Sequence, residues 1–560
     1  MRSVPRLLLC FVAALASVNG HAQSAADFVR GPLVALQEPV AAAVAEVRAP
    51  ALEAHIAFLA SPALEGRGLG SPGFEAAAEY VAAQLALTGI PPLMPVCDGC
   101  TGAAAYAQEV PLREVTERTG TLTLTVDDGV TTRARVFASG VDLVLPNNAA
   151  VRVSAPLVFA GYGIREPALD RDDYRGIDAR GKVVVVLAGL PPDPAWQTPE
   201  LVKLYAADDL EDRYSTKLAT AQTLGAAVLV VVEDASWATR LAEEALADRL
   251  FESFSDGAAE ITPPVVPVSP AVATFLAEAI GTNVTLAEVA PVSLPHVTAA
   301  LSVGGKERAL ASRNIIATLP GSDPELRDEA VILGAHLDHL GRVGAQVYPG
   351  ADDNASGVAA LLEIARVFGT MEHRPRRTLV FAFWTGEEEG KFGSGHWVRH
   401  PMWPLASTVA YINIDMIGHP WLIEEIRELV SGVPSDAAEA FLDGLDPANL
   451  VEVGLPPGNE LLAGTLRTVA LGTGFPLHLD RTDGRNGGSD YRDFARAGLP
   501  FLRFFGNFFP GYHEPDDTPD RVDPAQVQRV ARFCLATALL LADQGSSTSA
   551  YQPRETMVVP

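Results

Sequence analysis

Long apolar runs alternate with helical patterns in the second half of the chain. The runs at 331–335, 378–384 and 409–414 contain no charged residue and indicate buried strands. Between the first two, residues 358–366 have apolar positions at helical spacing. Strand, loop and helix in this order predict an α/β fold with a mixed, mostly parallel sheet flanked by helices. Sites in such folds form beyond the carboxyl ends of the strands.

Each of these strands ends in side chains that can carry chemistry. His336 and Asp338 follow the first strand two positions apart, so in an extended backbone both project from the same face. Glu387 and Glu388 follow the second strand, and Asp415 follows the third. Successive strands therefore deliver acids or an imidazole at their ends.

The first part of the chain is predicted to be mainly helical. Residues 25–49 are rich in alanine and valine, and residues 74–87 have apolar positions at helical spacing before a Gly-Ile-Pro-Pro stop. Residues 61–72 are rich in Gly, Ser and Pro and are expected to form a long turn. Alternating positions over 120–126 and 133–137 predict paired strands around an Asp-Asp-Gly turn.

The composition changes near residue 155, where short Val-rich strands begin. From 157–164 through 181–189 to 225–232 the pattern is of strands with an intervening helix, without a cluster of His, Asp and Glu at metal-ligand spacing. We therefore expect a non-catalytic inserted domain. The expected organisation is a signal peptide (1–22), the N-terminal part of the main α/β domain (23–150), the insert (151–290), the main part of that domain (291–545) and a tail (546–560).

Residues 1–22 have the pattern of a secretory signal peptide. Arg2 and Arg6 precede an apolar stretch from Leu7, and small residues near Ala22 fit a cleavage site. The alternative is a short N-terminal membrane anchor, but this stretch is too short to span a bilayer and no later stretch has spanning length. We expect export to the periplasm or the medium, without stable insertion into a membrane.

Charge and cysteine content narrow the classes of function. The formal charge of −27 argues against nucleic-acid binding, because contact with phosphates needs a positive surface. Cys97 and Cys100 lie in a turn-rich loop, where a small disulfide in an oxidising compartment is favoured over a metal site. Cys534 lies in an apolar C-terminal helix and is expected to belong to the core.

A mixture of histidines and carboxylates without cysteine suits Zn²⁺ in a hydrolytic site. Separately, Asp353 could be a turn residue, Glu388 part of a solvated helix start, and His513 a surface or core histidine. Asp415 stands in an apolar run, where a buried carboxylate needs a partner or a metal. Together the candidates are enough for a pair of metals that share one bridging carboxylate: His336, Asp353, Glu388, Asp415 and His513.

These positions fall in motifs that resemble those of the M28 family of zinc peptidases. The motifs are His336-Leu-Asp338, Gly350-Ala-Asp-Asp353-Asn-Ala-Ser-Gly, Glu387-Glu388 before Gly390, Ile414-Asp415-Met, and Tyr512-His513 with Asp517-Thr518. The resemblance covers about 50–150 and 295–545 and implies an α/β peptidase with two co-catalytic zinc ions. The insert is similar to a protease-associated domain in the stretches Gly161-Tyr-Gly-Ile, Gly181-Lys-Val-Val-Val-Val and Gly225-Ala-Ala-Val-Leu.

The resemblance implies a role for each metal-ligand candidate. Asp353 would bridge the two zinc ions, His336 and Asp415 would complete one site, and Glu388 and His513 would complete the other. The chain has consecutive acids at 387–389 where the family has two, and the distance to the following glycine sets the alignment.

The resemblance also implies roles for their neighbours. Glu387 would be the general base that takes a proton from the attacking water and later passes it to the leaving amine. Asp338 would hydrogen-bond the far nitrogen of His336 and fix its tautomer, and Asp517 would do the same for His513. Two further residues are expected to line the cleft: His339 and Asp490.

The leading hypothesis is an exported metallo-aminopeptidase that removes N-terminal residues from peptides. A carboxypeptidase on the same scaffold would need a cation for the substrate carboxylate, for which Arg342, Arg485 and Arg503 are available. A receptor-like binding protein should lack a ligand or the base, and this chain lacks none of them. Glutaminyl-cyclase-like relatives hold a single zinc ion and usually have no inserted domain.

Overall fold

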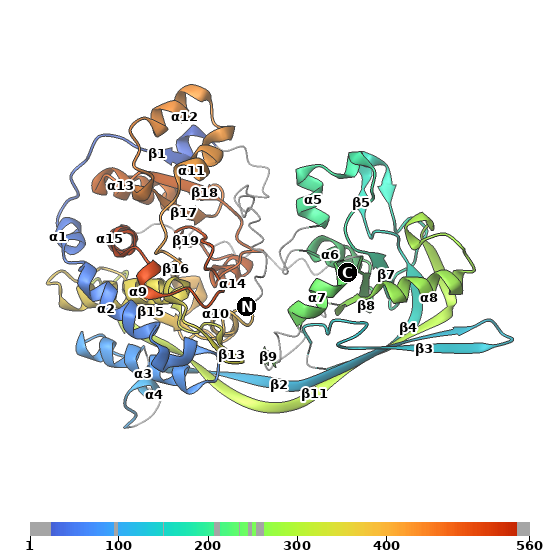
Figure 1. Cartoon of the computed structure of the whole chain (residues 1–560). Coiled ribbons are helices and arrows are strands. Elements are labelled where there is room, and N and C mark those ends of the chain that lie inside the picture. The colour runs from blue at the N-terminus through green and yellow to red at the C-terminus, as the bar shows by residue number, and fades with distance from the viewer. Residues whose placement is uncertain are drawn as a thin grey trace, which may run out of the picture. The chain divides into compact units, whose positions relative to one another are not determined.

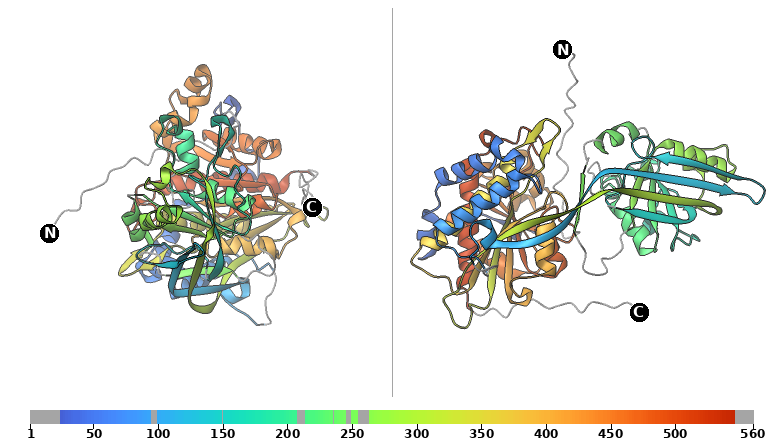
Figure 2. Two further views of the ribbon diagram at one scale, coloured as in Figure 1. Left: turned by 90° about the vertical axis from the view of Figure 1, so that its right-hand side faces the viewer. Right: turned by 90° about the horizontal axis from the view of Figure 1, so that it is seen from below.

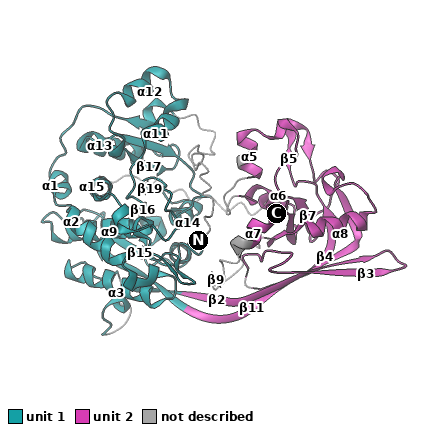
Figure 3. Cartoon of the chain, viewed as in Figure 1, with its two compact units in different colours: residues 1–110, 311–560 teal, residues 111–310 magenta. Residues whose placement is uncertain are grey.

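The computed structural model describes residues 24–93, 99–148, 150–206, 213–234, 236–244, 249–253 and 263–545. The chain divides into two compact units: unit 1 comprises residues 1–110 and 311–560, and unit 2 comprises residues 111–310 (Figure 3). The expected signal peptide (1–22), the tail (546–560) and Cys97 lie outside the described residues. Cys100 is disulfide-bonded, and Cys534 is free and buried.

Unit 1 is built on a mixed, mostly parallel sheet, as the sequence predicts (Figure 1). Parallel pairing joins β19 to β16, β16 to β12 and β12 to β15, whereas β17 runs antiparallel to β19. The strands lie in the order β1 (Phe28–Val29), β18 (Leu477–Arg481), β17 (Val451–Leu455), β19 (Phe501–Phe505), β16 (Thr408–Asp415), β12 (Ala330–His336), β15 (Thr378–Trp384) and β11 (Val292–Leu319).

Helices cover both faces of this sheet (Figures 1 and 2). On one face, Leu333 and Phe381 share a core with α2 (Ala49–Leu59), α3 (Pro72–Leu87), α9 (Gly357–Thr370), α13 (Glu460–Thr473) and α15 (Pro524–Asp543). On the other face, Trp384 and Tyr411 pack with α10 (Phe392–Arg399) and α14 (Tyr491–Arg496). Every residue of β12 and β15 is buried, which explains their uninterrupted apolar sequences.

Shorter elements of unit 1 connect or flank the sheet. The helical ones are η1 (Ala25–Asp27), α1 (Val40–Ala45), η2 (Pro62–Arg67), α4 (Ala103–Tyr106), η6 (Ala351–Ser356), η7 (Leu405–Ser407), α11 (Ile423–Leu429), η8 (Val430–Gly432), α12 (Ser435–Leu442), η9 (Pro447–Asn449) and η10 (Pro519–Arg521). A hairpin of β13 (Gly341–Val343) and β14 (Gln346–Tyr348) follows β12.

Unit 2 has its own run of parallel strands. These are β4 (Val151–Phe159), β7 (Val183–Leu187), β8 (Val228–Val232) and β10 (Val265–Val268), with β11 antiparallel to β4. The long strand β2 (Ala107–Asp127) pairs antiparallel with β3 (Thr132–Ala138) and β9 (Arg249–Ser253). Further elements are β5 (Arg165–Glu166), η3 (Pro167–Leu169), β6 (Arg171–Asp172), η4 (Pro194–Trp196), α5 (Pro199–Tyr205), α6 (Ser215–Thr223), α7 (Trp237–Glu244), α8 (Pro270–Ile280) and η5 (Leu286–Glu288).

The unit boundaries differ from those expected at 150 and 290. The chain passes between the units at 110/111 and 310/311, within β2 and β11. The reason is packing: Leu122 of β2, Phe137 of β3 and Leu301 of β11 share one buried core with Val185 of β7. The predicted pair of strands around the Asp-Asp-Gly turn is confirmed, but it belongs to unit 2.

The expectation of a helix over 25–49 is wrong. Phe28 and Val29 form an edge strand that pairs antiparallel with His478 and Leu477, and α1 covers only Val40–Ala45. The extended backbone at 28–29 gains a hydrogen-bonded partner strand, which outweighs the local alanine and valine composition. None of the helices in the described part of the chain is long and apolar enough to cross a bilayer.

Candidate metal centre

Side chains from three elements converge on His336, the last residue of β12. Its Nε2 lies 3.2 Å from Oδ1 of Asp353 and 3.2 Å from Oδ1 of Asp415. Asp353 comes from η6 and Asp415 ends β16, which lies beside β12 in the sheet. The site therefore lies at the carboxyl ends of parallel strands, as the sequence predicts.

A second group forms around His513 and shares Asp353 with the first. Nε2 of His513 lies 3.1 Å from Oδ2 of Asp353 and 3.1 Å from Oε2 of Glu388. Asp353 thus directs one carboxylate oxygen to each histidine. Ligand atoms of His336, Asp353 and Glu388 all lie within 4.8 Å of one another, which is the spacing of a metal-binding group.

The chemistry of these atoms fits a pair of zinc ions. Zinc–ligand distances of about 2.0–2.2 Å place the ligands of a tetrahedral ion about 3.3–3.6 Å apart. The separations between the ligand atoms here, 3.1 and 3.2 Å, are slightly shorter. Nε2 of His513 is buried and has no hydrogen bond of suitable geometry in the described chain. In the neutral imidazole this nitrogen would offer its lone pair to a metal.

The electrostatics of the group also call for positive charge. Burial lowers the pKa of His513, but the carboxylates of Glu388 and Asp353 outweigh burial and raise this pKa to about 11. Burial likewise opposes ionisation of Asp353, and the neighbouring imidazoles of His336 and His513 outweigh it and hold the pKa of Asp353 well below its usual range. Divalent cations between these ligands would supply the same compensation.

Glu387 lies beside this group, and its carboxylate can accept a proton. It is buried, and its Oε1 accepts no hydrogen bond of suitable geometry from the described residues, although Nζ of Lys391 lies 3.2 Å away. Burial raises the pKa of Glu387 well above its ordinary value, and Lys391 opposes the shift. A carboxylate with a raised pKa is a stronger base, which is what a general base requires.

Asp338 has a different contact from the one expected. Nδ1 of His336 lies 3.2 Å from the main-chain oxygen of Asp338, not from its carboxylate. The carboxylate accepts hydrogen bonds from the N–H groups of Glu387 and Glu388, at 3.1 and 3.3 Å. The turn after β15 has unpaired N–H groups, and the buried carboxylate satisfies them while its own backbone orients the imidazole. Asp338 therefore positions both a ligand and the adjacent acid.

Asp517 also departs from its expected role. No hydrogen bond joins it to His513 in the described structure. Its carboxylate accepts instead from the N–H groups of Asp352 and Asp353, at 2.9 and 3.1 Å, and so holds the loop that carries the shared carboxylate. Burial, reinforced by Asp352, raises the pKa of Asp517 to about 7.

The two cleft-lining candidates lie close to the centre. Nδ1 of His339 lies 2.5 Å from Oε1 of Glu388, a contact that the sequence did not indicate. Asp490 is fully buried with neither carboxylate oxygen hydrogen-bonded in the described residues. Burial raises the pKa of Asp490 to about 7. It touches no metal-ligand candidate within hydrogen-bonding distance.

Comparison with known proteins relates the segment that carries this centre to a family of peptidases. Residues 314–538 match the model of Peptidase family M28, and the match includes the metal-ligand candidates and Glu387. This segment of the chain is therefore similar to the peptidases of that family.

Relatives of this chain carry both aminopeptidase and carboxypeptidase names. A probable lipoprotein aminopeptidase from Mycobacterium tuberculosis is 26% identical over 82% of this chain and 77% of that protein. A probable glutamate carboxypeptidase from Arabidopsis thaliana is 29% identical over 48% of this chain and 37% of that protein. The chain thus spans little more than a third of the length of that relative, and 32% and 14% of two further probable glutamate carboxypeptidases.

A solved structure shares the fold over most of the chain. An aminopeptidase from Aneurinibacillus sp. strain AM-1 superposes with a TM-score of 0.51, at 19% identity, over 91% of this chain and 97% of that one.

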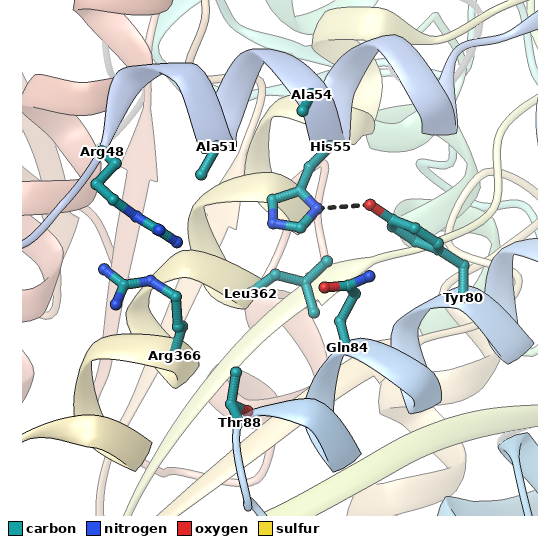
Figure 4. A pocket seen from close by; sticks show the side chains of 9 residues that line it. All are labelled: Arg48, Ala51, Ala54, His55, Tyr80, Gln84, Thr88, Leu362 and Arg366. Carbon is teal, nitrogen blue, oxygen red and sulfur yellow. Dashed lines mark hydrogen bonds between the residues drawn. The ribbon is translucent and has the colours of Figure 1, made fainter.

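A pocket of about 290 Å³ lies elsewhere in unit 1, between α2, α3 and α9 (Figure 4). Arg48 and Arg366 stand at one end, and His55, hydrogen-bonded to Tyr80, stands at the other. Both guanidinium groups bind the buried carboxylate of Glu363, at 3.0 and 2.8 Å. The pocket shares no residue with the metal centre, and the Arg48–Glu363 ion pair ties the start of α2 to α9.

Proposed function

We propose that this protein is an exported di-zinc metallopeptidase that removes amino-terminal residues from peptides. The observation that carries the proposal is the pair of histidines arranged around one carboxylate, Asp353, with distances of 3.1 and 3.2 Å from its two oxygens. The M28 match over the same residues supports it. Export rests on the signal-like sequence of residues 1–22.

The residues divide into two ligand sets. His336, Asp353 and Asp415 would hold one zinc ion, and Asp353, Glu388 and His513 would hold the other. When bound, the ions would polarise the scissile carbonyl and lower the pKa of the attacking water.

Glu387 would act as the general base and then as the general acid. Its buried carboxylate would take a proton from the attacking water and return it to the amine as the peptide bond breaks. Asp338 fixes the N–H of Glu387 at 3.1 Å and so sets where this carboxylate lies. Lys391, 3.2 Å away, would stabilise the ionised form before the proton is taken.

The surrounding charge favours an amino-terminal substrate. Besides the ligands, the buried acids Asp338, Glu387 and Asp490 lie around the centre, which favours an α-ammonium group over a carboxylate. The exposed ring of Tyr512 stacks on His513, and the exposed ring of Phe508 contacts Tyr512. These rings favour an apolar first residue.

A carboxypeptidase is the second candidate, because the names of several relatives specify that activity. Its anchor for the substrate carboxylate would have to come from a cation. Arg503 is held by Glu452 and Asp480 at 2.7 and 3.0 Å, and Arg342 lies 3.4 Å from Glu65. Arg485 is exposed. Two of the three candidate arginines thus already have acidic partners, which weighs against this activity.

Unit 2 is proposed to be a protease-associated-like domain that restricts access to peptides or binds them. Its parallel strands β4, β7, β8 and β10 agree with the short strands that carry the resemblance. Deletion is not a clean test of this role, because β2 and β11 continue into unit 1.

The activity is tested with three versions of one short peptide that begins with leucine: unblocked, N-acetylated and C-amidated. An aminopeptidase cleaves the unblocked and amidated peptides from the amino end, leaves the acetylated one intact, and stops when a zinc chelator is added. A carboxypeptidase cleaves the acetylated peptide and spares the amidated one. Failure to cleave any of them, with two zinc ions bound, would favour a binding protein.

A further inference from the structure

Arg67 is a buried arginine outside the segment that matches the M28 family. It ends η2, in the stretch of residues 61–72 that the sequence marks only as a long turn. The residue is 1% exposed, and its φ is +52°, a conformation that favours glycine. A long cationic side chain held in such a position is unusual unless the surrounding structure requires it.

The guanidinium group of Arg67 donates to main-chain oxygens around the ligands. Nε donates to Leu337, at 2.9 Å, between His336 and Asp338. Further donors reach the oxygens of Leu59, Pro349, Gly350 and Asp353, at 2.7, 2.8, 2.9 and 3.4 Å respectively. The contacts at 349, 350 and 353 fix the loop that places the shared carboxylate.

Asp517 complements Arg67 on the same loop. It accepts from the N–H groups of Asp352 and Asp353, whereas Arg67 binds the oxygens of Gly350 and Asp353. A cation and an anion from distant parts of the chain thus satisfy opposite polar groups of one buried segment. Burial lowers the pKa of Arg67 to about 10, against the opposing effect of Asp517 and other carboxylates, so the group stays charged at neutral pH.

Glycines on either side of Arg67 allow its segment to approach the site. A Cβ at Gly66 would lie 2.2 Å from the main-chain oxygen of Tyr348, and one at Gly68 would lie 2.9 Å from Cα of Gly341. These contacts press the 66–68 segment against the β13–β14 hairpin that precedes the ligand loop. The Gly-Arg-Gly sequence is therefore a packing requirement of the site.

We propose that Arg67 is a positioning residue that holds the Asp353 loop and the end of β12 in the geometry that binds two metal ions. The proposal rests on the proposed metal centre, but its test does not depend on catalysis. A planar fork of donors can bind several oxygens at fixed angles, whereas the compact ammonium group of lysine cannot. Without the fork, buried oxygens would lose their donors and the loop would move to satisfy them.

The test compares Arg67→Lys with Arg377→Lys. Arg377 is also 1% exposed and donates to the main-chain oxygens of Leu541 and Gln544, but it precedes β15 and so lies at the opposite end of the strand from the metal centre. The affinity of each folded apoprotein for Zn²⁺ is measured by competition with a chromophoric chelator, and the absorption spectrum of bound Co²⁺ reports the ligand geometry. Loss of a group that supports metal ligands lowers affinity by about 10- to 100-fold.

We expect this loss of zinc affinity, with an altered Co²⁺ spectrum, for Arg67→Lys and not for Arg377→Lys. Arg67→Gly, which the positive φ accommodates, should lose at least as much affinity. Wild-type zinc affinity and an unchanged spectrum in Arg67→Lys would overturn the proposal. So would failure of Arg67→Lys to fold in excess zinc, because the guanidinium would then be holding the fold rather than the loop. An inactive wild-type protein that binds two metals tightly would refute the proposed peptidase activity and leave this inference standing.

Discussion

Buried charge is arranged in opposite ways in unit 2 and at the metal centre of unit 1. In unit 2, Asp173 accepts from the N–H groups of Tyr162 and Ile164, and Lys217 donates to the oxygens of Leu187 and Gly189, at 2.8 and 2.7 Å. In unit 1, the potential metal-ligand atoms of His336, Asp353 and Glu388 face one another instead. Parallel strands support both arrangements. The difference indicates that buried charge is structural where the chain satisfies it, and functional where it awaits an external cation.

The largest expected effect comes from the carboxylate that both histidines share. Asp353→Asn should remove both zinc ions and reduce peptide hydrolysis to the level of the chelated enzyme, because each ligand set loses a charged member. Metal content by mass spectrometry and turnover of an unblocked peptide measure this. Asp415→Asn is the matched control. Among the metal-ligand candidates in the described structure Asp415 is paired with His336, so its loss should remove one ion. Loss of a single ion in Asp353→Asn would contradict the bridging role.

Removal of the base should separate turnover from metal binding. Glu387→Gln keeps the size of the side chain but cannot accept the proton, so kcat should fall by about 10²- to 10⁴-fold. Both zinc ions should remain, because Glu387 contacts no histidine in the described structure. If zinc is lost in step with activity, Glu387 is a ligand and the alignment of the acids at 387–389 is displaced by one residue.

Zinc should stabilise unit 1 and leave unit 2 unchanged. Ligand present at about 1,000 times its Kd stabilises the state that binds it by about 4 kcal/mol. Hydrogen exchange with and without a chelator should therefore slow in β12 and η6 when zinc is present, and stay the same in β7 and β8. Equal protection of both units by zinc would mean that the charged groups of unit 2 also bind metal.

The sequence predicts the strands and the metal-ligand candidates of unit 1 better than it predicts the residues that hold those ligands in place. Runs such as 378–384 are buried on both faces, so composition alone locates them. His336 and Asp415 end their strands, and the other ligands lie in loops where motif position is informative. Arg67 binds main-chain oxygens of residues as distant as Leu337 and Asp353, and no side-chain pattern marks such acceptors. Only its flanking glycines hint at close packing.

Two other errors have the same physical origin. The sequence cannot distinguish the main-chain oxygen of Asp338 from its carboxylate as the partner of His336, since both are on one residue. The strand at Phe28 depends on an edge that His478 provides from the other end of the chain. Tertiary partners decide both cases, and local propensity contains no information about them.

The smallest expected effect concerns Lys217 in unit 2. Burial lowers its pKa from 10.5 to about 7. Between these values the unfolded chain binds a proton that the native state does not, so the free energy of unfolding rises with pH. The electrostatic penalty is full below about pH 7 and disappears as pH rises through the unfolded value. A neutral amine has two N–H donors, which match the oxygens of Leu187 and Gly189.

Lys217→Met should therefore change the pH dependence of unit 2 alone. Relative to this variant, the wild type should gain up to about 1.4 kcal/mol of local stability per pH unit in that window. Hydrogen exchange of β7 and β8 between pH 6.5 and 9.5 measures the difference. Lys182, which is partly exposed and lies 3.3 Å from Asp178, gives the matched control Lys182→Met. Equal slopes for the wild type and Lys217→Met would mean that the buried amine stays charged, and unit 2 would then resemble unit 1 in holding unmet charge.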